Sequence, residues 1–148
     1  MAELIIAEEN ELPADDLARV YAGLMAADPR TPLGRNFQPL VLAMRDAHGA
    51  LCGGLLGETV WTWFSVGVIW VSPELRGAGQ GARLLRAAEE LALARGCTHA
   101  RLDTFDWQAR GFYERRGYEV YGQLDGFPEG HTQYHLRKSL LIVPRSAT

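Results

Sequence analysis

The chain has 148 residues, of which 47% are hydrophobic, and its formal net charge at pH 7 is −3. This size and composition favour one globular domain, residues 1–148, with a substantial core. The mild acidity and the lack of any lysine- or arginine-rich block argue against nucleic-acid binding, and no apolar run approaches the roughly 20 residues that span a bilayer.

The N-terminal residues and the cysteines favour a cytoplasmic protein. The opening sequence MAELIIAEEN reaches acidic side chains after a short apolar run and does not follow the plan of a secretory signal. Cys52 and Cys97 are isolated thiols with no CxxC spacing and no histidine cluster. The sequence therefore indicates neither a disulfide framework nor a metal site, and we expect a reduced, cytoplasmic protein.

In chain order, the first expected elements are a strand, a helix and a loop. Leu4–Ala7 is a short apolar run that predicts a strand. A helix follows, because apolar residues recur at helical spacing at Leu17, Val20, Tyr21 and Leu24. The segment DPRTPLGRN, residues 28–36, contains two prolines and a glycine, which predict an exposed loop. Arg30 or Arg35 in this loop could hold an anionic group of a substrate.

The middle of the chain predicts three antiparallel strands and a long helix. Two apolar runs in FQPLVLAMRDAHGALCGGLLGE are separated by DAHG, which predicts a hairpin turn. The run WTWFSVGVIWV continues to Val71 with β-branched and aromatic residues typical of a strand. A helix begins near Gly79 and stops at Gly96, and its apolar face is formed by Leu84, Leu85, Ala88, Leu91 and Ala92.

The last third predicts three short strands around a short helix. HARLDTF is expected to be a strand, QARGFYERR a helix closed by Gly117, and YEVYG and TQYHLRKSL a final strand pair. Residues 143–148, VPRSAT, are expected to form a loose tail. The fold class is therefore α/β (α+β), a mixed sheet of about six or seven strands flanked by helices.

The junction between the strand that ends at Val71 and the long helix carries three glycines and an arginine. Gly77, Gly79 and Gly81 let a ligand approach the main chain, where the first helical turn leaves its N–H groups without internal partners. The helix dipole and Arg76 both favour an anion at this point. The residues predict a cradle for a diphosphate.

Among phosphate-binding loops, this stretch is most similar to one family. It lacks the Lys-Ser or Lys-Thr pair of the NTPase loop, and the residues after its third glycine do not fit the dinucleotide fingerprint. RGAGQG resembles the R-x-x-G-x-G coenzyme A pyrophosphate loop of the GNAT superfamily of N-acetyltransferases, and VSPEL resembles the approach to it. The later stretch DWQARGFYERRGYEV is similar to a second motif of that family through Ala109, Tyr113, Gly117 and Tyr118.

The resemblance implies acetyl-CoA as cosubstrate and assigns residues to its parts. The loop that would bind the diphosphate comprises Arg76, Gly77, Ala78, Gly79, Gln80, Gly81 and Ala82. Main-chain N–H groups of Ile69, Trp70 and Val71 would lie near the thioester carbonyl. Splaying of this strand from the one at Leu102–Phe105 would leave main-chain groups unpaired for the pantetheine arm. Asp106 stands where the family often has an asparagine that contacts the pantetheine arm. Tyr113 would protonate the departing thiolate.

The activity implied is acetyl transfer to a primary amine of a small molecule or a peptide. Four residues stay open as the general base, namely Glu58, His99, Asp103 and His131. A non-catalytic acyl-CoA sensor of the same fold is the alternative, and a nucleotide-binding module is a weaker one. The final strands could also pair with a second copy of the chain to form a homodimer, because edge strands invite pairing.

Overall fold

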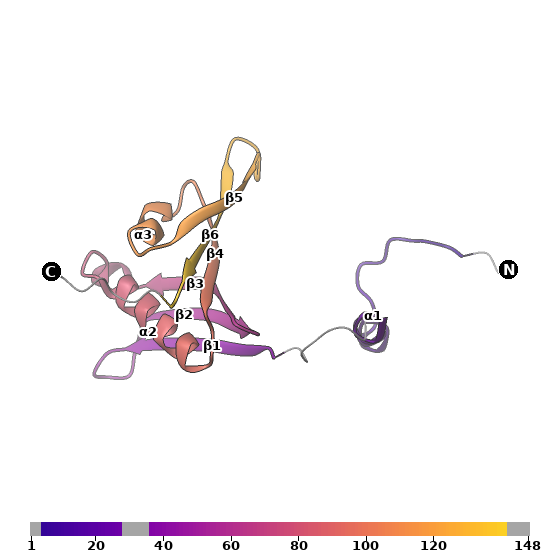
Figure 1. Cartoon of the computed structure of the whole chain (residues 1–148), viewed down its shortest axis with the longest axis horizontal. Helices are drawn as coiled ribbons and strands as arrows, with labels where there is room; N and C mark the ends of the chain where they lie inside the picture. Colours follow the sequence, from indigo (N-terminus) through magenta and orange to yellow (C-terminus); the bar gives the residue numbers. More distant parts are fainter. Residues whose placement is uncertain (1–3, 28–35, 142–148) are drawn as a thin grey trace. The chain divides into compact units, whose positions relative to one another are not determined.

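The structure is a computed structural model that describes residues 4–27 and 36–141. These residues belong to two compact units, 1–34 and 35–148. The described part of the first unit contains the helix α1, and the second contains a six-stranded sheet with the helices α2 and α3 (Figure 1). The expected loop with Arg30 and Arg35 and the expected tail 143–148 lie outside the described residues. The single domain over 1–148 stays a prediction.

In the first unit, α1 (Ala14–Ala27) confirms the helix predicted from apolar spacing. Asp15 and Asp16 lie in its first turn, where the helix dipole favours negative charge. The predicted strand at Leu4–Ala7 is wrong, because residues 4–13 form neither helix nor strand. Four apolar residues do not make a stable strand without a partner to pair with, and no described strand pairs with them.

The sheet of the second unit is mixed, as predicted, with the order β1-β2-β3-β4-β6-β5. Its strands are β1 (Gln38–Arg45), β2 (Leu51–Val60), β3 (Trp63–Val71), β4 (His99–Phe105), β5 (Glu119–Asp125) and β6 (Thr132–Ser139). Only the β3–β4 pair is parallel among these strands, and the other four pairs are antiparallel. The three predicted antiparallel strands in the middle of the chain are therefore confirmed.

The pairing of β2 with β3 contains a bulge at Gly67. Leu56 pairs with Val68 and Gly57 pairs with Val66, so Gly67 is an extra residue without a partner. A Cβ at this position would stand 3.0 Å from the carbonyl oxygen of Leu56, which is closer than side chains normally pack. The bulge therefore favours glycine and bends the strand just before its last four residues.

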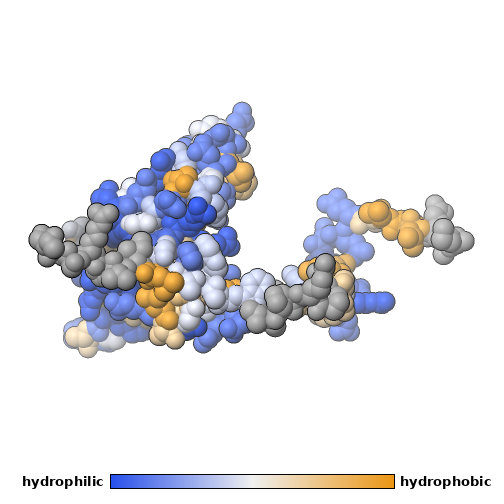
Figure 2. Space-filling view, in the orientation of Figure 1, coloured by the Kyte–Doolittle hydropathy of each residue, from blue (hydrophilic) through white to orange (hydrophobic). Residues whose placement is uncertain are grey.

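The long predicted helix is α2 (Gln80–Ala94), which packs on one face of the sheet (Figure 1). Gly79 caps its N-terminus with φ +78°, and Gly96 follows its C-terminus with φ +90°. The core between α2 and the sheet comprises side chains such as Leu40, Leu55, Phe64, Leu85, Ala88, Ala92, Ala100, Leu102 and Leu136. Figure 2 shows that hydrophilic residues cover most of the visible surface of this unit, with small separate apolar patches.

The parallel pair β3–β4 opens part of the way along. Ladder partners run from Trp63 with His99 to Val66 with Leu102, and none follow beyond that point. The later residues of β3, 68–71, keep their partners on β2 but have no ladder partner on the other edge among the described residues. The splayed strands expected from the resemblance are confirmed, and they leave main-chain groups of β3 available to a ligand.

The short helix α3 (Arg110–Glu114) and a 3-10 turn at Pro73–Leu75 complete the second unit. Gly117, with φ +93°, lies two residues beyond the cap of α3, in agreement with the predicted stop. In the described part of the chain, no helix is long and apolar enough to cross a membrane.

Candidate active site

A cavity of about 350 Å³ lies at the N-terminus of α2, and we call it the cradle cavity. Its walls come from the end of β3, the glycine-rich turn and the region of α3. It is lined by Val71, Leu75, Arg76, Gly77, Gly79, Gln80, Gly81, Ala82, Phe112 and Arg116. Seven of these ten residues, from Val71 to Ala82 apart from Leu75, were assigned to the cosubstrate from the sequence.

The turn presents main chain to the cradle cavity. The first hydrogen bond of α2 runs from the N–H of Arg83 to the carbonyl of Gly79, at 3.0 Å. The N–H groups before it have no intrahelical acceptor and lie at the positive end of the helix dipole. Gly77 and Gly79 have φ of +80° and +78°, and no other described residue lies within 4 Å of a Cβ placed there. These properties suit an anion that contacts the backbone.

Arg76 supplies a fixed cation to the same cavity. Its Nε donates a hydrogen bond to the carbonyl oxygen of Val71, at 3.0 Å. This bond ties the guanidinium to the end of β3 and leaves its terminal nitrogens without a partner among the described residues. An arginine held in this way can present two parallel N–H groups to a phosphate.

A second cavity, of about 320 Å³, occupies the opening between β3 and β4, and we call it the splay cavity. It is lined by Gly67, Val68, Ile69, Asp103, Thr104, Gln108, Ala109 and Tyr113. The two cavities follow each other along the same elements, because Ile69 and Tyr113 line this one while Val71 and Phe112 line the cradle cavity. One elongated ligand could therefore occupy both.

Tyr113 on α3 enters the splay cavity from the side of the core. Its ring packs edge-to-face against Tyr118, with 5.8 Å between the ring centroids. Its hydroxyl has no hydrogen-bond partner among the described residues. Burial raises the pKa of the Tyr113 phenol above its ordinary value of 10, so the group is a proton donor throughout the neutral range.

Asp103 enters the splay cavity from β4. Its neighbours Leu102 and Thr104 are buried on the α2 face, so strand alternation directs Asp103 to the opposite face of the sheet. A hydrogen bond of 2.5 Å joins Asp103 Oδ1 to Nδ1 of His135, its direct partner across the β4–β6 ladder. Of the four residues considered as general base, only Asp103 lines this cavity.

The other three candidates lie in different settings. Glu58 lines a separate cavity with Leu56 and Ser65. His99 stacks on Trp63, with 4.7 Å between ring centroids. His131 is bonded to Asp106 through Nδ1 and Oδ1, at 3.0 Å.

Three residues assigned to the cosubstrate from the sequence line neither cavity. The second carboxylate oxygen of Asp106 accepts the N–H of Thr132, so this side chain joins the end of β4 to the start of β6. Trp70 is 43% exposed and points away from the cavity walls that its neighbours Ile69 and Val71 form. Ala78 lies between two glycines of the cradle cavity but is not part of its wall.

Sequence reasoning missed His135, Arg116 and the remaining walls of the two cavities. His135 alternates with buried Leu136 in a strand pattern, which indicates only that it faces away from the core. Its position opposite Asp103 depends on a register between segments 32 residues apart.

In the described part of the chain, no group of three or more histidine, cysteine or acidic residues could hold a metal ion.

Comparison with known proteins identifies the family. The model of the acetyltransferase (GNAT) family matches residues 8–118. A blasticidin-S acetyltransferase from Streptomyces morookaense is 42% identical over 94 residues, which are 63% of this chain and 69% of that protein. The acetyltransferase Atu2258 from Agrobacterium fabrum is 35% identical over 99 residues, 67% of this chain and 72% of that protein.

The fold agrees with these relatives. A crystal structure of an acetyltransferase from Bacillus cereus superimposes with a TM-score of 0.77 at 25% identity, covering 90% of this chain and 97% of that one. The family model spans well over half of the chain and includes the glycine-rich turn, α2 and α3. The chain is therefore an acyltransferase that belongs to the GNAT family of acetyltransferases.

Proposed function

We propose that this enzyme transfers the acetyl group of acetyl-CoA to a primary amine by direct attack of the amine on the thioester. The observation that carries the proposal is the pair of consecutive cavities, one lined by the glycine-rich turn and Arg76 and one lined by the Tyr113 phenol and the Asp103 carboxylate. Coenzyme A is a long molecule with a diphosphate near one end and a thiol at the other. Its length suits this arrangement.

The cradle cavity binds the diphosphate in this proposal, through main-chain N–H groups of the turn and through Arg76. The pantetheine arm then runs along the open edge of β3. Main-chain N–H groups near Ile69 are the donors for the oxyanion that forms when the amine attacks the carbonyl carbon. Donors fixed in this way typically contribute about 3 kcal/mol to the stability of such a transition state.

Tyr113 acts as the general acid. When the carbon–sulfur bond breaks, the leaving thiolate takes the proton of the Tyr113 hydroxyl and departs as the thiol of coenzyme A. The raised pKa of Tyr113 keeps the proton on the phenol until the thiolate forms. Support comes from its place in the wall of the splay cavity, where its hydroxyl has no hydrogen-bond partner among the described residues.

Asp103 acts as the general base. The attacking nitrogen gives its proton to the Asp103 carboxylate, which His135 holds in position by the bond to Oδ1. Asp103 contacts the reacting amine in this proposal, whereas His135 is a positioning residue. The amine would enter from the face of the sheet opposite α2, since Asp103 points to that face.

The acceptor is a small amine-bearing molecule in this proposal. Support comes from the relative named blasticidin-S acetyltransferase, which is 42% identical over the matched residues. A panel of blasticidin S, aminoglycosides, polyamines, amino acids and lysine peptides would identify the acceptor. The test is release of free thiol from acetyl-CoA with each amine. If the full-length protein binds acetyl-CoA in calorimetry but acetylates no amine in a broad panel, the alternative of a non-catalytic acyl-CoA sensor replaces this proposal.

A further inference from the structure

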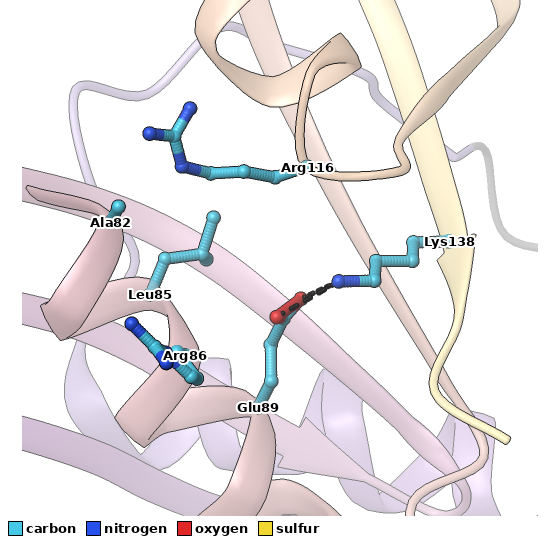
Figure 3. A pocket seen from close by; sticks show the side chains of 6 residues that line it. All are labelled: Ala82, Leu85, Arg86, Glu89, Arg116 and Lys138. Atoms are coloured by element: carbon cyan, nitrogen blue, oxygen red, sulfur yellow. Dashed lines mark hydrogen bonds and ion pairs between the residues drawn. The ribbon is translucent and has the colours of Figure 1, made fainter. Parts of the chain in front are cut away.

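A third cavity, of about 270 Å³, lies between α2 and the segment that follows α3, and we call it the lateral cavity. It is lined by Ala82, Leu85, Arg86, Glu89, Arg116 and Lys138 (Figure 3). Ala82 and Arg116 also line the cradle cavity, so the two cavities share a wall. A ligand bound in the cradle cavity would lie beside the lateral cavity.

Among the described residues, Glu89 supplies the only carboxylate of the lateral cavity, and this carboxylate is already bound. Lys138 Nζ donates to both oxygens of Glu89, at 3.0 Å each, as the dashed lines of Figure 3 indicate. The hydroxyl of Tyr118 donates to Oε2 of Glu89 at 2.9 Å. The charges of Glu89 and Lys138 therefore cancel, and the Glu89 carboxylate is not available to balance another cation.

The positive charges of two arginines of the lateral cavity are not balanced by a carboxylate of any described residue. Arg86 forms no hydrogen bond or ion pair with any described residue. Arg116 stacks over the ring of Phe112, 3.8 Å from its centroid, and Nη1 donates to the carbonyl oxygen of Phe112 at 2.7 Å. In Figure 3, Arg116 extends across the cavity toward Ala82, on the side of the cradle cavity. Two guanidinium groups with no anionic partner in the described part of the chain indicate a site for an anion.

We propose that the lateral cavity binds the 3′-phosphate of coenzyme A and makes the enzyme prefer coenzyme A to its 3′-dephospho form. This inference rests on the proposed function, because it needs the diphosphate of coenzyme A in the cradle cavity. The ribose of coenzyme A carries the diphosphate on one carbon and a phosphate monoester on another, so the monoester reaches the adjoining cavity. This phosphate monoester carries nearly two negative charges, which Arg86 and Arg116 neutralise.

The test compares the dissociation constants of coenzyme A and 3′-dephospho-coenzyme A for the full chain, measured by calorimetry. The native protein is expected to bind coenzyme A about tenfold more tightly, which is the value of one good charge-assisted hydrogen bond. Arg86→Gln should remove most of this difference by weakening coenzyme A alone. Arg83→Gln is the matched control, because Arg83 lies on the same helix but lines another cavity, with Leu42.

Each result has one interpretation. If the native protein binds both compounds equally, or if Arg86→Gln keeps the preference, the lateral cavity does not bind the 3′-phosphate and the proposed function is unaffected. If Arg83→Gln removes the preference as fully as Arg86→Gln, the cause is the overall charge of α2, and the inference is wrong. If neither compound binds to the native protein, the proposed function itself fails. Loss of preference in Arg86→Gln alone supports the inference.

Discussion

Asp103 and Tyr113 line the same cavity from opposite sides of the sheet. Asp103 belongs to β4 and points away from α2, whereas Tyr113 belongs to α3 and packs against the core on the α2 side. The cavity passes between the splayed strands, so it connects the two faces. A thioester held there would have a proton acceptor on the side of the incoming amine and a proton donor on the side of the departing sulfur.

Replacing Tyr113 by phenylalanine should lower turnover by about 100-fold or more, because general acid catalysis typically contributes 10²- to 10⁴-fold. The affinity for acetyl-CoA should change little, since the hydroxyl acts only when the thiolate forms. The raised pKa of Tyr113 also predicts that the native rate shows no loss of this acid below about pH 10. Single-turnover rates across pH would check both points. A loss below about threefold would exclude the acid role.

Replacing Asp103 by asparagine should reduce the rate at neutral pH by about 100-fold, because the amide cannot accept the proton of the amine. His135→Gln should cause a smaller loss and should change the pH profile, since His135 only positions the carboxylate. Glu119→Gln is a suitable control, because Glu119 pairs with Arg137 at the exposed edge of the sheet. If Asp103→Asn keeps the native pH profile, another group accepts the proton.

Replacing Gly79 by alanine should weaken acetyl-CoA binding by about tenfold or more, because the new side chain would occupy the space beside the diphosphate. The matched control is Gly96→Ala at the other end of α2. Gly96 also has positive φ and no other described residue within 4 Å of a Cβ, so both variants should lose about 1 kcal/mol of stability. Calorimetry and urea denaturation would separate binding from stability. Equal affinities of the two variants would contradict a backbone cradle.

Replacing Lys138 by methionine should destabilise the protein by about 3 kcal/mol, because it leaves the buried carboxylate of Glu89 without its cation. The neighbouring variant Arg137→Met should cost less than about 1 kcal/mol, because the Arg137–Glu119 pair is exposed. Urea denaturation of both variants provides the comparison. Similar losses in the two would mean that burial does not set the strength of these ion pairs.

The Tyr118 phenol should make the stability of the protein depend on alkaline pH. Burial, and then the negative charge of Glu89, raise the pKa of Tyr118 far above 10. A raised pKa means that the fold prefers the protonated phenol, so its stabilising effect is complete below about pH 10 and is lost as the pH rises further. The free energy of unfolding should therefore fall as the pH rises above about 10, and less steeply in Tyr118→Phe. Parallel slopes for the two proteins would exclude this cause.

Local patterns predicted most of the second unit correctly. The DAHG turn, the three antiparallel strands and the glycine-bounded helix α2 each depend on residues close together in sequence. The N–H of His48 and that of Ala50 both bind the carboxylate of Asp46, as expected of an aspartate at the start of a turn. The error at Leu4–Ala7 has the opposite origin, because a strand needs a partner that a local pattern does not specify.

The candidate site was only partly predictable for the same reason. The glycine-rich turn carries its own conformational signal, so the wall of the cradle cavity could be recognised from sequence. The hydrogen-bond partners of Asp103 and Asp106 could not be predicted from sequence. Each bond joins the region of β4 to the region of β6 and depends on the register of the two strands. Nor could alternation in WTWFSVGVIWV show which residues of β3 line the cavities, since the bulge lies inside that run.

The bulge at Gly67 determines which side chains of β3 the ligand would meet. Phe64 and Val66 point to the core, and simple alternation would direct Val68 and Trp70 to the same side. The unpaired Gly67 shifts the alternation of inward and outward side chains by one residue. Ile69 and Val71 therefore point to the core side, and Val68 and Trp70 are exposed instead. A single glycine thus places an isoleucine and a valine, instead of a bulky indole, in the walls of the two cavities.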